Sequence, residues 1–187
     1  MDLKYQTMRY PLMIVMAVLV LSACTPTVQF SEPMPPGRLN LPNIPKAMRG
    51  EIVDSDRGGD SWLMGKDTLW AGEEYWVNGE DFVLRRMAGH IVMSKRVAET
   101  GFWEVIPIRR TQDSMYLCQF DDDSDRLQRI SAILEVAPET RVSEGTPGYE
   151  YSLLSPSAKG FRALLHERLY AEEEGGMLLP KGAVIRP

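Results

Sequence analysis

The chain has 187 residues, about the size of one ordinary domain. Its 26 acidic residues outnumber its 21 basic residues, which gives a net charge of −5. It therefore lacks the excess of basic residues that draws proteins to nucleic acid or to anionic headgroups, and we expect no nucleic-acid partner.

The first 23 residues have the pattern of a secretory signal peptide. Lys4 and Arg9 precede an apolar run over 12–21, which at about ten residues is half of the roughly 20 that a membrane span needs. Basic residues, a short apolar run and small residues at its exit are the three parts of such a signal. An uncleaved single-pass anchor is the alternative interpretation.

The apolar run ends in "LSAC" at positions 21–24, which resembles the lipobox of bacterial lipoproteins. The resemblance covers residues 1–24. It implies that the sulfur of Cys24 receives a diacylglyceryl group, that signal peptidase II cuts before Cys24, and that the new amine is acylated. Each buried methylene contributes about 0.8 kcal/mol, so two or more acyl chains anchor a protein stably. Thr25 stands where some inner-membrane lipoproteins carry aspartate, which favours delivery to the outer membrane.

Residues 24–45 form a proline-rich segment, with six prolines and little hydrophobic periodicity. Proline favours extended polyproline conformations, so we predict a lipidated, semi-rigid tether. The alternative is a segment that packs across the domain through four apolar residues, Phe30, Leu39, Leu41 and Ile44. Residues 46–187 are predicted to form a single globular domain.

Short runs rich in aromatic and β-branched residues alternate with turn signals from about residue 48 to 121. Asn78-Gly79 suits the two positive-φ positions of a type I′ turn, so it should join strands over 68–77 and 80–87. Further strands are predicted over 90–98, 102–111 and 115–120, from the alternation typical of a half-buried antiparallel sheet. Pro107 has no N–H to donate, which predicts a sheet edge or a bulge there.

Two amphipathic helices are predicted in the C-terminal half. The first follows the acidic run 121–125, whose carboxylates suit a helix N-terminus, and ends at Pro138. The second begins at Ser155 and Pro156 and is closed by "EEEGG" at 172–176, with a terminal strand over 177–185. Their apolar stripes are Leu127, Ile130, Ile133 and Leu134 in the first and Phe161, Leu164, Leu165 and Leu169 in the second.

These elements predict an α+β fold, an antiparallel β-meander of about six to eight strands with two helices packed on it. The order of lipobox, proline-rich segment, "IPKAMRGEI", meander and "SPSAKGFRALLHERLY" is similar to that of a group of uncharacterised lipoproteins from Bacteroidetes-type bacteria. That group implies no reaction.

Candidate chemical sites are few. The acidic run fails as an EF-hand, because Arg126 and Ala132 stand where glycine and glutamate are required. His90 and His166 have no ligands at zinc spacing. If Cys24 carries lipid, no disulfide can form within the chain, and Cys118 is predicted to be a buried structural residue. A nucleophilic arrangement of Cys118 with a histidine and a carboxylate is a minor alternative.

An aromatic cluster raises the question of a ligand-binding face. Aromatic residues in a meander are usually core and cross-strand pairs, but a face that stacks sugars or holds an apolar ligand is the alternative. The cluster consists of Trp62, Trp70, Tyr75, Trp76, Phe82, Phe102 and Trp103.

We therefore expect a lipid-anchored protein of the bacterial envelope that is a non-catalytic binding or interaction module, with no cofactor and no metal. Its expected partners are the membrane, through Cys24, and an envelope protein or small ligand. A lipocalin-like binder would need the aromatic residues to line an empty cavity. An envelope enzyme would need His90 or His166 within hydrogen-bond reach of Cys118 or a carboxylate.

Overall fold

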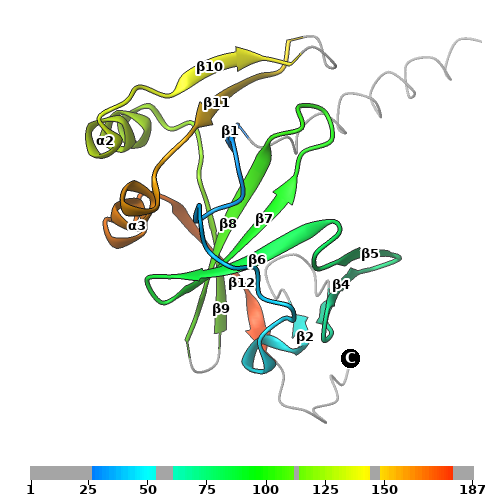
Figure 1. Cartoon of the computed structure of the whole chain (residues 1–187). Helices are drawn as coiled ribbons and strands as arrows, with labels where there is room; N and C mark the ends of the chain where they lie inside the picture. The colour runs from blue at the N-terminus through cyan, green and yellow to red at the C-terminus, as the bar shows by residue number, and fades with distance from the viewer. Residues whose placement is uncertain (1–26, 54–60, 112–113, 144–147, 179–187) are drawn as a thin grey trace, which may run out of the picture.

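A computed structural model describes residues 27–53, 61–111, 114–143 and 148–178 (Figure 1). In chain order its elements are β1 (Val28–Phe30), η1 (Lys46–Met48, one turn of 3₁₀ helix), β2 (Gly50–Val53), β3 (Ser61–Met64), β4 (Thr68–Ala71), β5 (Glu74–Val77), β6 (Phe82–Met87), β7 (His90–Arg96), β8 (Trp103–Arg110), β9 (Ser114–Gln119), α2 (Ser124–Leu134), β10 (Glu139–Val142), β11 (Glu150–Leu154), α3 (Ala158–His166) and β12 (Ala171–Leu178). The described part is a mostly antiparallel sheet with two α-helices, broadly the predicted α+β class.

The described strands form one twelve-stranded sheet, larger than the predicted six to eight strands. Its order is β10-β11-β1-β8-β9-β12-β2-β3-β4-β5, and β7 and β6 continue from the other edge of β8. Two pairings depart from a simple meander. Strand β12 lies between β9 and β2, and β1 pairs with β11 in parallel. Segments far apart in sequence therefore complete the sheet.

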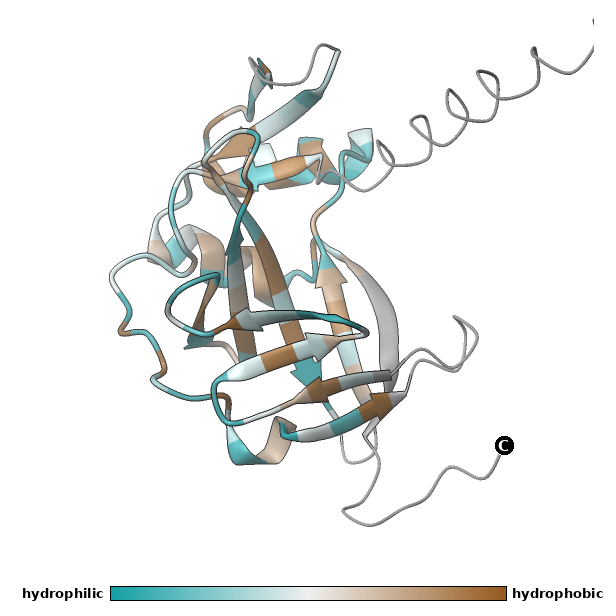
Figure 2. Ribbon diagram, turned by 90° about the vertical axis from the view of Figure 1, so that its right-hand side faces the viewer, coloured by the Kyte–Doolittle hydropathy of each residue, from teal (hydrophilic) through white to brown (hydrophobic). Residues whose placement is uncertain are grey.

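Two hydrophobic clusters lie on opposite faces of β7, β8 and β9, because successive side chains of a strand point to opposite faces. Bands of hydrophobic and hydrophilic residues accordingly alternate along several strands in Figure 2. One cluster contains Ile44, Met48, Ile52, Met64, Leu69, Phe82, Leu84, Met93, Ile108 and Met115. The other packs the helices on the sheet and contains Val28, Phe30, Met34, Met87, Val92, Val105, Cys118, Phe120, Ile130, Leu154, Phe161, Leu164, Leu165, Leu169 and Tyr170.

Residues 28–45, predicted as part of a tether, instead belong to the fold. Phe30 in β1 is fully buried, and Met34 and Ile44 are buried as well. Leu39 is 91% exposed. The packing alternative therefore describes this segment, although Leu39 does not contribute to it. Residues 24–26 of the predicted tether lie outside the described residues.

The guanidinium of Arg85 in β6 holds the proline-rich segment in place. Prolines cannot donate backbone hydrogen bonds, so the segment cannot form a regular ladder. Nη1 of Arg85 donates to the carbonyl oxygens of Pro33 at 2.5 Å and Pro35 at 2.9 Å, and Nε donates to Oδ1 of Asn40 at 2.8 Å. Partial burial lowers the pKa of Arg85, and the charge of Glu32 acts in the opposite direction.

The hairpin predicted at Asn78-Gly79 is wrong. The predicted strand over 68–77 is itself a hairpin of β4 and β5, in which Ala71 pairs with Glu74. Strand β6 pairs with β7 instead. Asn78 sits at a bend between β5 and β6, where the only pairing is an isolated parallel bridge to Phe82 among the described residues. Its Nδ2 donates to the carbonyl oxygen of Leu41 at 2.9 Å. Asn78 therefore contacts the N-terminal segment and does not form the hairpin turn that its local preference suggested.

A two-residue turn with positive φ does occur, at Ala88-Gly89 between β6 and β7. The φ angles are 49° and 80°, as a type I′ turn requires, and Met87 pairs with His90 across it. Alanine is uncommon in this region because its Cβ is crowded there. The turn is therefore strained at Ala88.

The prediction for Pro107 was a sheet edge or a bulge. Strand β8 has neighbours on both sides, so the edge strand is wrong. Pro107 pairs with Val92 of β7 on one side. On the other side β8 pairs with β1 at Trp103 and with β9 from Ile108 onward, so among the described strands none pairs with Pro107 there. Pro107, which has no N–H to donate, therefore lies where β8 has no partner on one side.

Helix α2 confirms the predicted cap. The carboxylate of Asp123 accepts a hydrogen bond from the backbone N–H of Arg126 at 2.9 Å. Ile130 is buried, and the other residues of the predicted stripe pack against the same cluster. The helix ends at Leu134 and not at Pro138, because Glu135 adopts a φ of 56°.

Helix α3 forms with different ends from those predicted. Its cap is Ser157, whose Oγ accepts from the N–H of Gly160 at 3.1 Å, and Ser155 lies outside the helix. The helix ends at His166, well before residues 172–176, which belong to β12. Strand β12 thus begins earlier than the predicted terminal strand, whose residues 179–185 lie outside the described part.

Candidate functional site

The predicted lipidation residue, Cys24, lies outside the described residues, so its modification stays a prediction. None of the helices in the described part of the chain has the length and hydrophobicity that a membrane span requires.

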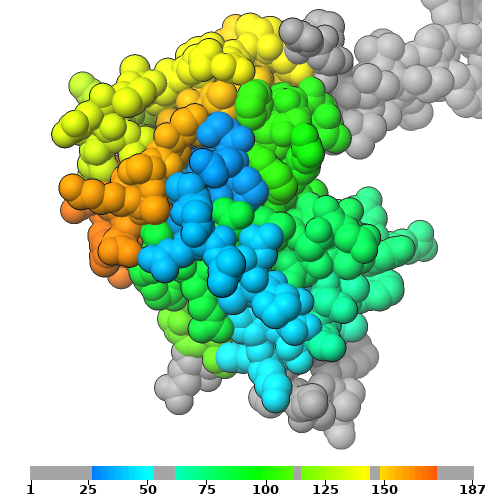
Figure 3. Space-filling view, in the orientation of Figure 1, coloured from blue at the N-terminus to red at the C-terminus, as the bar shows by residue number. Residues whose placement is uncertain are grey.

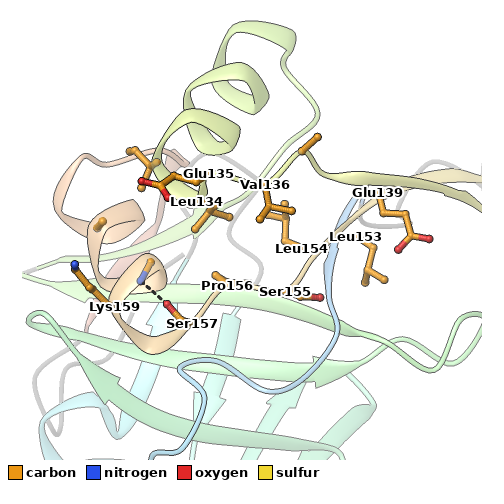
Figure 4. A pocket seen from close by; sticks show the side chains of 14 residues that line it. Leu134, Glu135, Val136, Glu139, Leu153, Leu154, Ser155, Pro156, Ser157 and Lys159 are labelled. Carbon is orange, nitrogen blue, oxygen red and sulfur yellow. Dashed lines mark hydrogen bonds between the residues drawn. The ribbon is translucent and has the colours of Figure 1, made fainter.

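The candidate binding site is a groove of about 510 Å³ between the two helices and strands β10 and β11 at one edge of the sheet (Figure 4). The end of α2 and the residues after it form one wall, and the start of α3 forms the other. It is lined by Ile133, Leu134, Glu135, Val136, Ala137, Glu139, Leu153, Leu154, Ser155, Pro156, Ser157, Lys159, Gly160 and Ala163. This volume lies in the range typical of small-molecule sites.

The middle of the groove is apolar and its ends are charged. Figure 4 shows Leu134, Val136 and Leu154 between Lys159 on one side and Glu139 on the other. Val136 is 68% exposed. An exposed apolar side chain in a concave surface loses contact with water when a ligand or partner covers it, which favours binding.

A close approach of the two helices shapes the groove. A Cβ added to Gly160 would lie 2.8 Å from Cδ2 of Leu134, so glycine lets the two helices approach closely at this point. The left-handed conformation of Glu135 turns the chain away from α2 and places Val136 over the groove. The site thus depends on two backbone features, one in each wall.

The charge at one end is fixed by an ion pair. Nη2 of Arg141 lies 2.8 Å from Oε2 of Glu139, and this hydrogen bond lowers the pKa of the Glu139 carboxyl. Both side chains are exposed, so we assign the pair little stabilising energy. Its consequence is a carboxylate that stays ionised beside the groove.

The two histidines have different surroundings. His90 is 8% exposed, with Nδ1 3.0 Å from the carbonyl oxygen of Ala88 and Nε2 3.0 Å from the hydroxyl of Tyr170. Because a carbonyl only accepts, Nδ1 carries a proton, and Nε2 of a neutral ring then accepts from the hydroxyl. His166 is exposed in the last turn of α3. Neither histidine is among the described residues that line the groove.

Cys118 is fully buried in the cluster beneath the helices, as predicted for a structural residue. Phe120 follows on the same strand face and lies in the same cluster. Cys118 is not among the described residues that line the groove.

The predicted aromatic cluster is dispersed over several surfaces. Phe82 is buried with Trp62 and Trp76 packed against its cluster, and Trp103 packs against the other cluster. Trp70 and Tyr75 are exposed on the β4–β5 hairpin, with ring centroids 5.1 Å apart. Phe102 faces the guanidinium of Arg141 at 5.3 Å. These rings do not line one cavity, which removes the main support for a lipocalin-like binder.

The acidic run serves helix α2. Asp123 caps it, and Asp121 forms an ion pair with Arg126. Among the residues that the structure describes, no cluster of three or more His, Cys, Asp and Glu side chains could hold a metal ion.

The groove itself was not predicted from the sequence. Its walls come from two helices and the ends of two strands, and its lining carries none of the residue patterns that mark a catalytic or metal site. The available signals were Gly160 inside an otherwise regular helical pattern and the apolar Val136 directly after α2.

Comparison of the chain with protein-family models, with curated proteins and with solved structures found no match.

Proposed function

We propose that this protein is a lipid-anchored binding module of the bacterial envelope, held through Cys24 and without catalytic activity. The "LSAC" stretch at 21–24 supports the anchor. The observation that carries the binding role is the groove between α2 and α3, whose middle is apolar and whose ends are charged. An extended or elongated partner with an apolar centre fits this pattern best.

The anchor would hold the domain close to the membrane. Val28, the first residue of β1, is only four residues after Cys24, and four residues span at most about 14 Å. The carbonyl of Thr27 accepts from the N–H of Ser152 at 2.8 Å, so the chain is already fixed to β11 at this point. A lipidated Cys24 would therefore leave no long tether between the bilayer and the sheet.

Replacement of each cysteine tests the anchor. Cys24→Ser should abolish incorporation of labelled palmitate and release the protein from the envelope fraction. Cys118→Ser is the matched control, because Cys118 is buried in the fold, and this variant should keep both the label and the location. Palmitate in the Cys24→Ser protein, or none in the wild type, would contradict the anchor.

Photo-crosslinking in intact envelopes tests the binding role. A photoreactive amino acid in place of Val136, in the groove, should give a discrete adduct. The same amino acid in place of Leu39, which is also apolar and exposed but lies elsewhere, is the control. Identical adducts from both positions, or none from position 136, would count against the groove as the binding site.

A further inference from the structure

A second hollow, of about 400 Å³, lies at the β6–β7 turn and shares no lining residue with the groove. Three arginines from separate parts of the chain line it: Arg38 from the segment after β1, Arg86 from β6 and Arg162 from α3. In Figure 3 these three segments lie side by side, in blue, green and orange. We call this site the arginine hollow; Met87, Ala88, Gly89, His90 and Ile91 complete its lining.

The three guanidinium groups have no partners within the described part of the chain. All three side chains are exposed, and none makes a hydrogen bond or ion pair with a described residue. The described lining also contains no Asp or Glu, although the chain has 26 acidic residues against 21 basic ones. Like charges placed together repel one another, so this arrangement favours a bound anion that neutralises them.

The backbone positions of the three arginines are fixed by the fold. Arg86 pairs with Ile91 in the β6–β7 ladder. The segment that carries Arg38 is held on both sides by the hydrogen bonds of Arg85 to Pro35 and Asn40. Arg162 follows Phe161, whose side chain is fully buried beneath α3. A fixed backbone reduces the conformational freedom that is lost when a ligand binds, although the exposed side chains still have to order.

The floor of the hollow is also held rigidly. His90 forms hydrogen bonds through Nδ1 to Ala88 and through Nε2 to Tyr170, each 3.0 Å long. These bonds tie the turn to the residues after α3. Ala88 keeps its strained φ of 49° in this turn, and such strain is concentrated at functional sites.

We propose that the arginine hollow binds the phosphate group of an organic phosphoester. The planar guanidinium matches the oxygens of a phosphate with two parallel hydrogen bonds, and arginine is the usual residue for this recognition. The volume leaves room for a group the size of glycerol or a sugar beside the phosphate. The phosphoester is either a soluble metabolite or the headgroup of a lipid. This binding does not depend on the lipid anchor or on the groove.

Calorimetric titration of the full-length protein with glycerol 3-phosphate tests the proposal. We expect saturable binding at low ionic strength that weakens as salt is added, and no binding of glycerol. Arg86→Gln should weaken binding at least tenfold. The double variant Arg38→Gln/Arg162→Gln, which loses two of the three guanidinium groups, should bind more weakly than Arg86→Gln does. Arg129→Gln, at an exposed position on α2, is the matched control and should bind as the wild type does.

Vesicles distinguish the two sources of phosphate. With Cys24→Ser protein, so that no anchor contributes, binding to phosphatidylcholine vesicles that contain phosphatidic acid but not to pure phosphatidylcholine indicates a lipid headgroup. Binding of glycerol 3-phosphate without vesicle binding indicates a soluble phosphoester. Binding of neither ligand by protein with the wild-type melting temperature, or equal loss in Arg86→Gln and Arg129→Gln, would overturn the proposal.

Discussion

Glu104 carries the carboxyl group whose burial has a direct consequence for stability. It lies in β8 opposite Lys95 of β7. Burial raises its pKa above the ordinary value of 4.5, and the positive charge of Lys95 offsets only part of this effect. The folded state therefore holds the proton more tightly than the unfolded chain does. This contribution to stability is complete below the ordinary pKa and is lost as the pH rises through the raised value.

Replacement of Glu104 by Gln should remove this pH dependence. At pH 7 the variant no longer buries a charge, so its free energy of unfolding should exceed that of the wild type, while at pH 4 the two should be nearly equal. Urea unfolding at both pH values measures the difference. Glu51→Gln, at an exposed position of β2, should show no such gain. A Glu104→Gln protein that is less stable than the wild type at pH 7 would contradict this account.

The hydrogen bonds of Arg85 give a second prediction at the scale of single residues. Its neighbour Arg86 provides a matched control. Arg85→Met keeps the aliphatic part of the side chain but removes the hydrogen bonds to Pro33, Pro35 and Asn40. Hydrogen bonds from charged groups contribute about 1.5–3 kcal/mol each, so the loss should be at least about 1.5 kcal/mol. Arg86→Met removes no hydrogen bond to a described residue and should change the free energy of unfolding by less than about 0.5 kcal/mol. Similar losses in both variants would show that Arg85 does not hold the segment.

At the scale of elements, the end of helix α3 has the geometry of a Schellman motif. The N–H of Leu169 donates to the carbonyl of Leu164 at 3.1 Å, and the N–H of Arg168 donates to that of Leu165 at 3.3 Å. Leu169 is buried, as the hydrophobic partner of such a motif usually is. Arg168 occupies the position where glycine is preferred, with a φ of 51°.

Arg168→Gly should therefore stabilise the protein, by about 0.5–1 kcal/mol, since glycine adopts this conformation without crowding. Arg129→Gly in the interior of α2 is the matched control and should cost about 1 kcal/mol, because the backbone there is helical. Thermal or urea unfolding measures both changes. Equal losses in the two variants would mean that position 168 is not held in the left-handed region.

The elements that sequence reasoning located correctly are those whose pattern is local. Strands β7, β8 and β9 are short runs rich in aromatic and β-branched residues between turn signals, and the stripe of α2 around Ile130 is regular, so local patterns were sufficient to find them. The cap is also local, and it was placed within the acidic run 121–125, although not at Asp123 in particular. The number of strands and the helix ends were predicted less accurately. Helix α3, for example, ends through the backbone conformation of Arg168 and not at a residue with a clear signal.

The elements that were missed depend on partners far away in the sequence. Strand β1 lies in a proline-rich stretch and is stabilised by pairing with β11, more than a hundred residues later. The charged residues at the start of β12 were interpreted as the end of a helix, but they pair with β9 in the structure. Both candidate binding sites follow the same rule. The groove joins the end of α2 to the start of α3, and the arginine hollow joins three separate segments. Such sites exist only once long-range contacts form.

At the scale of the whole molecule, the docked N-terminal segment decides how an anchored protein would face the membrane. Strands β1 and β11 are parallel, so the start of β11 lies at the end of the domain from which the chain leads back to Cys24. Figure 1 shows β2, which follows η1, toward the opposite end of the molecule. Lipidation at Cys24 would thus bring Glu150 of β11 close to the headgroups and keep Lys46 of η1 far from them.

A fluorophore at each of these positions tests this orientation in reconstituted vesicles. Both side chains are exposed, so Glu150→Cys and Lys46→Cys, each combined with Cys118→Ser, can be labelled. A lipid with a nitroxide headgroup should quench the label at position 150 strongly and the label at position 46 weakly, since quenching requires near contact. Equal quenching at both positions in vesicle-bound protein would contradict the short connection to β1 while leaving the anchor intact. Failure of the protein to remain on vesicles would instead count against lipidation of Cys24, so the two ideas are separated by one experiment.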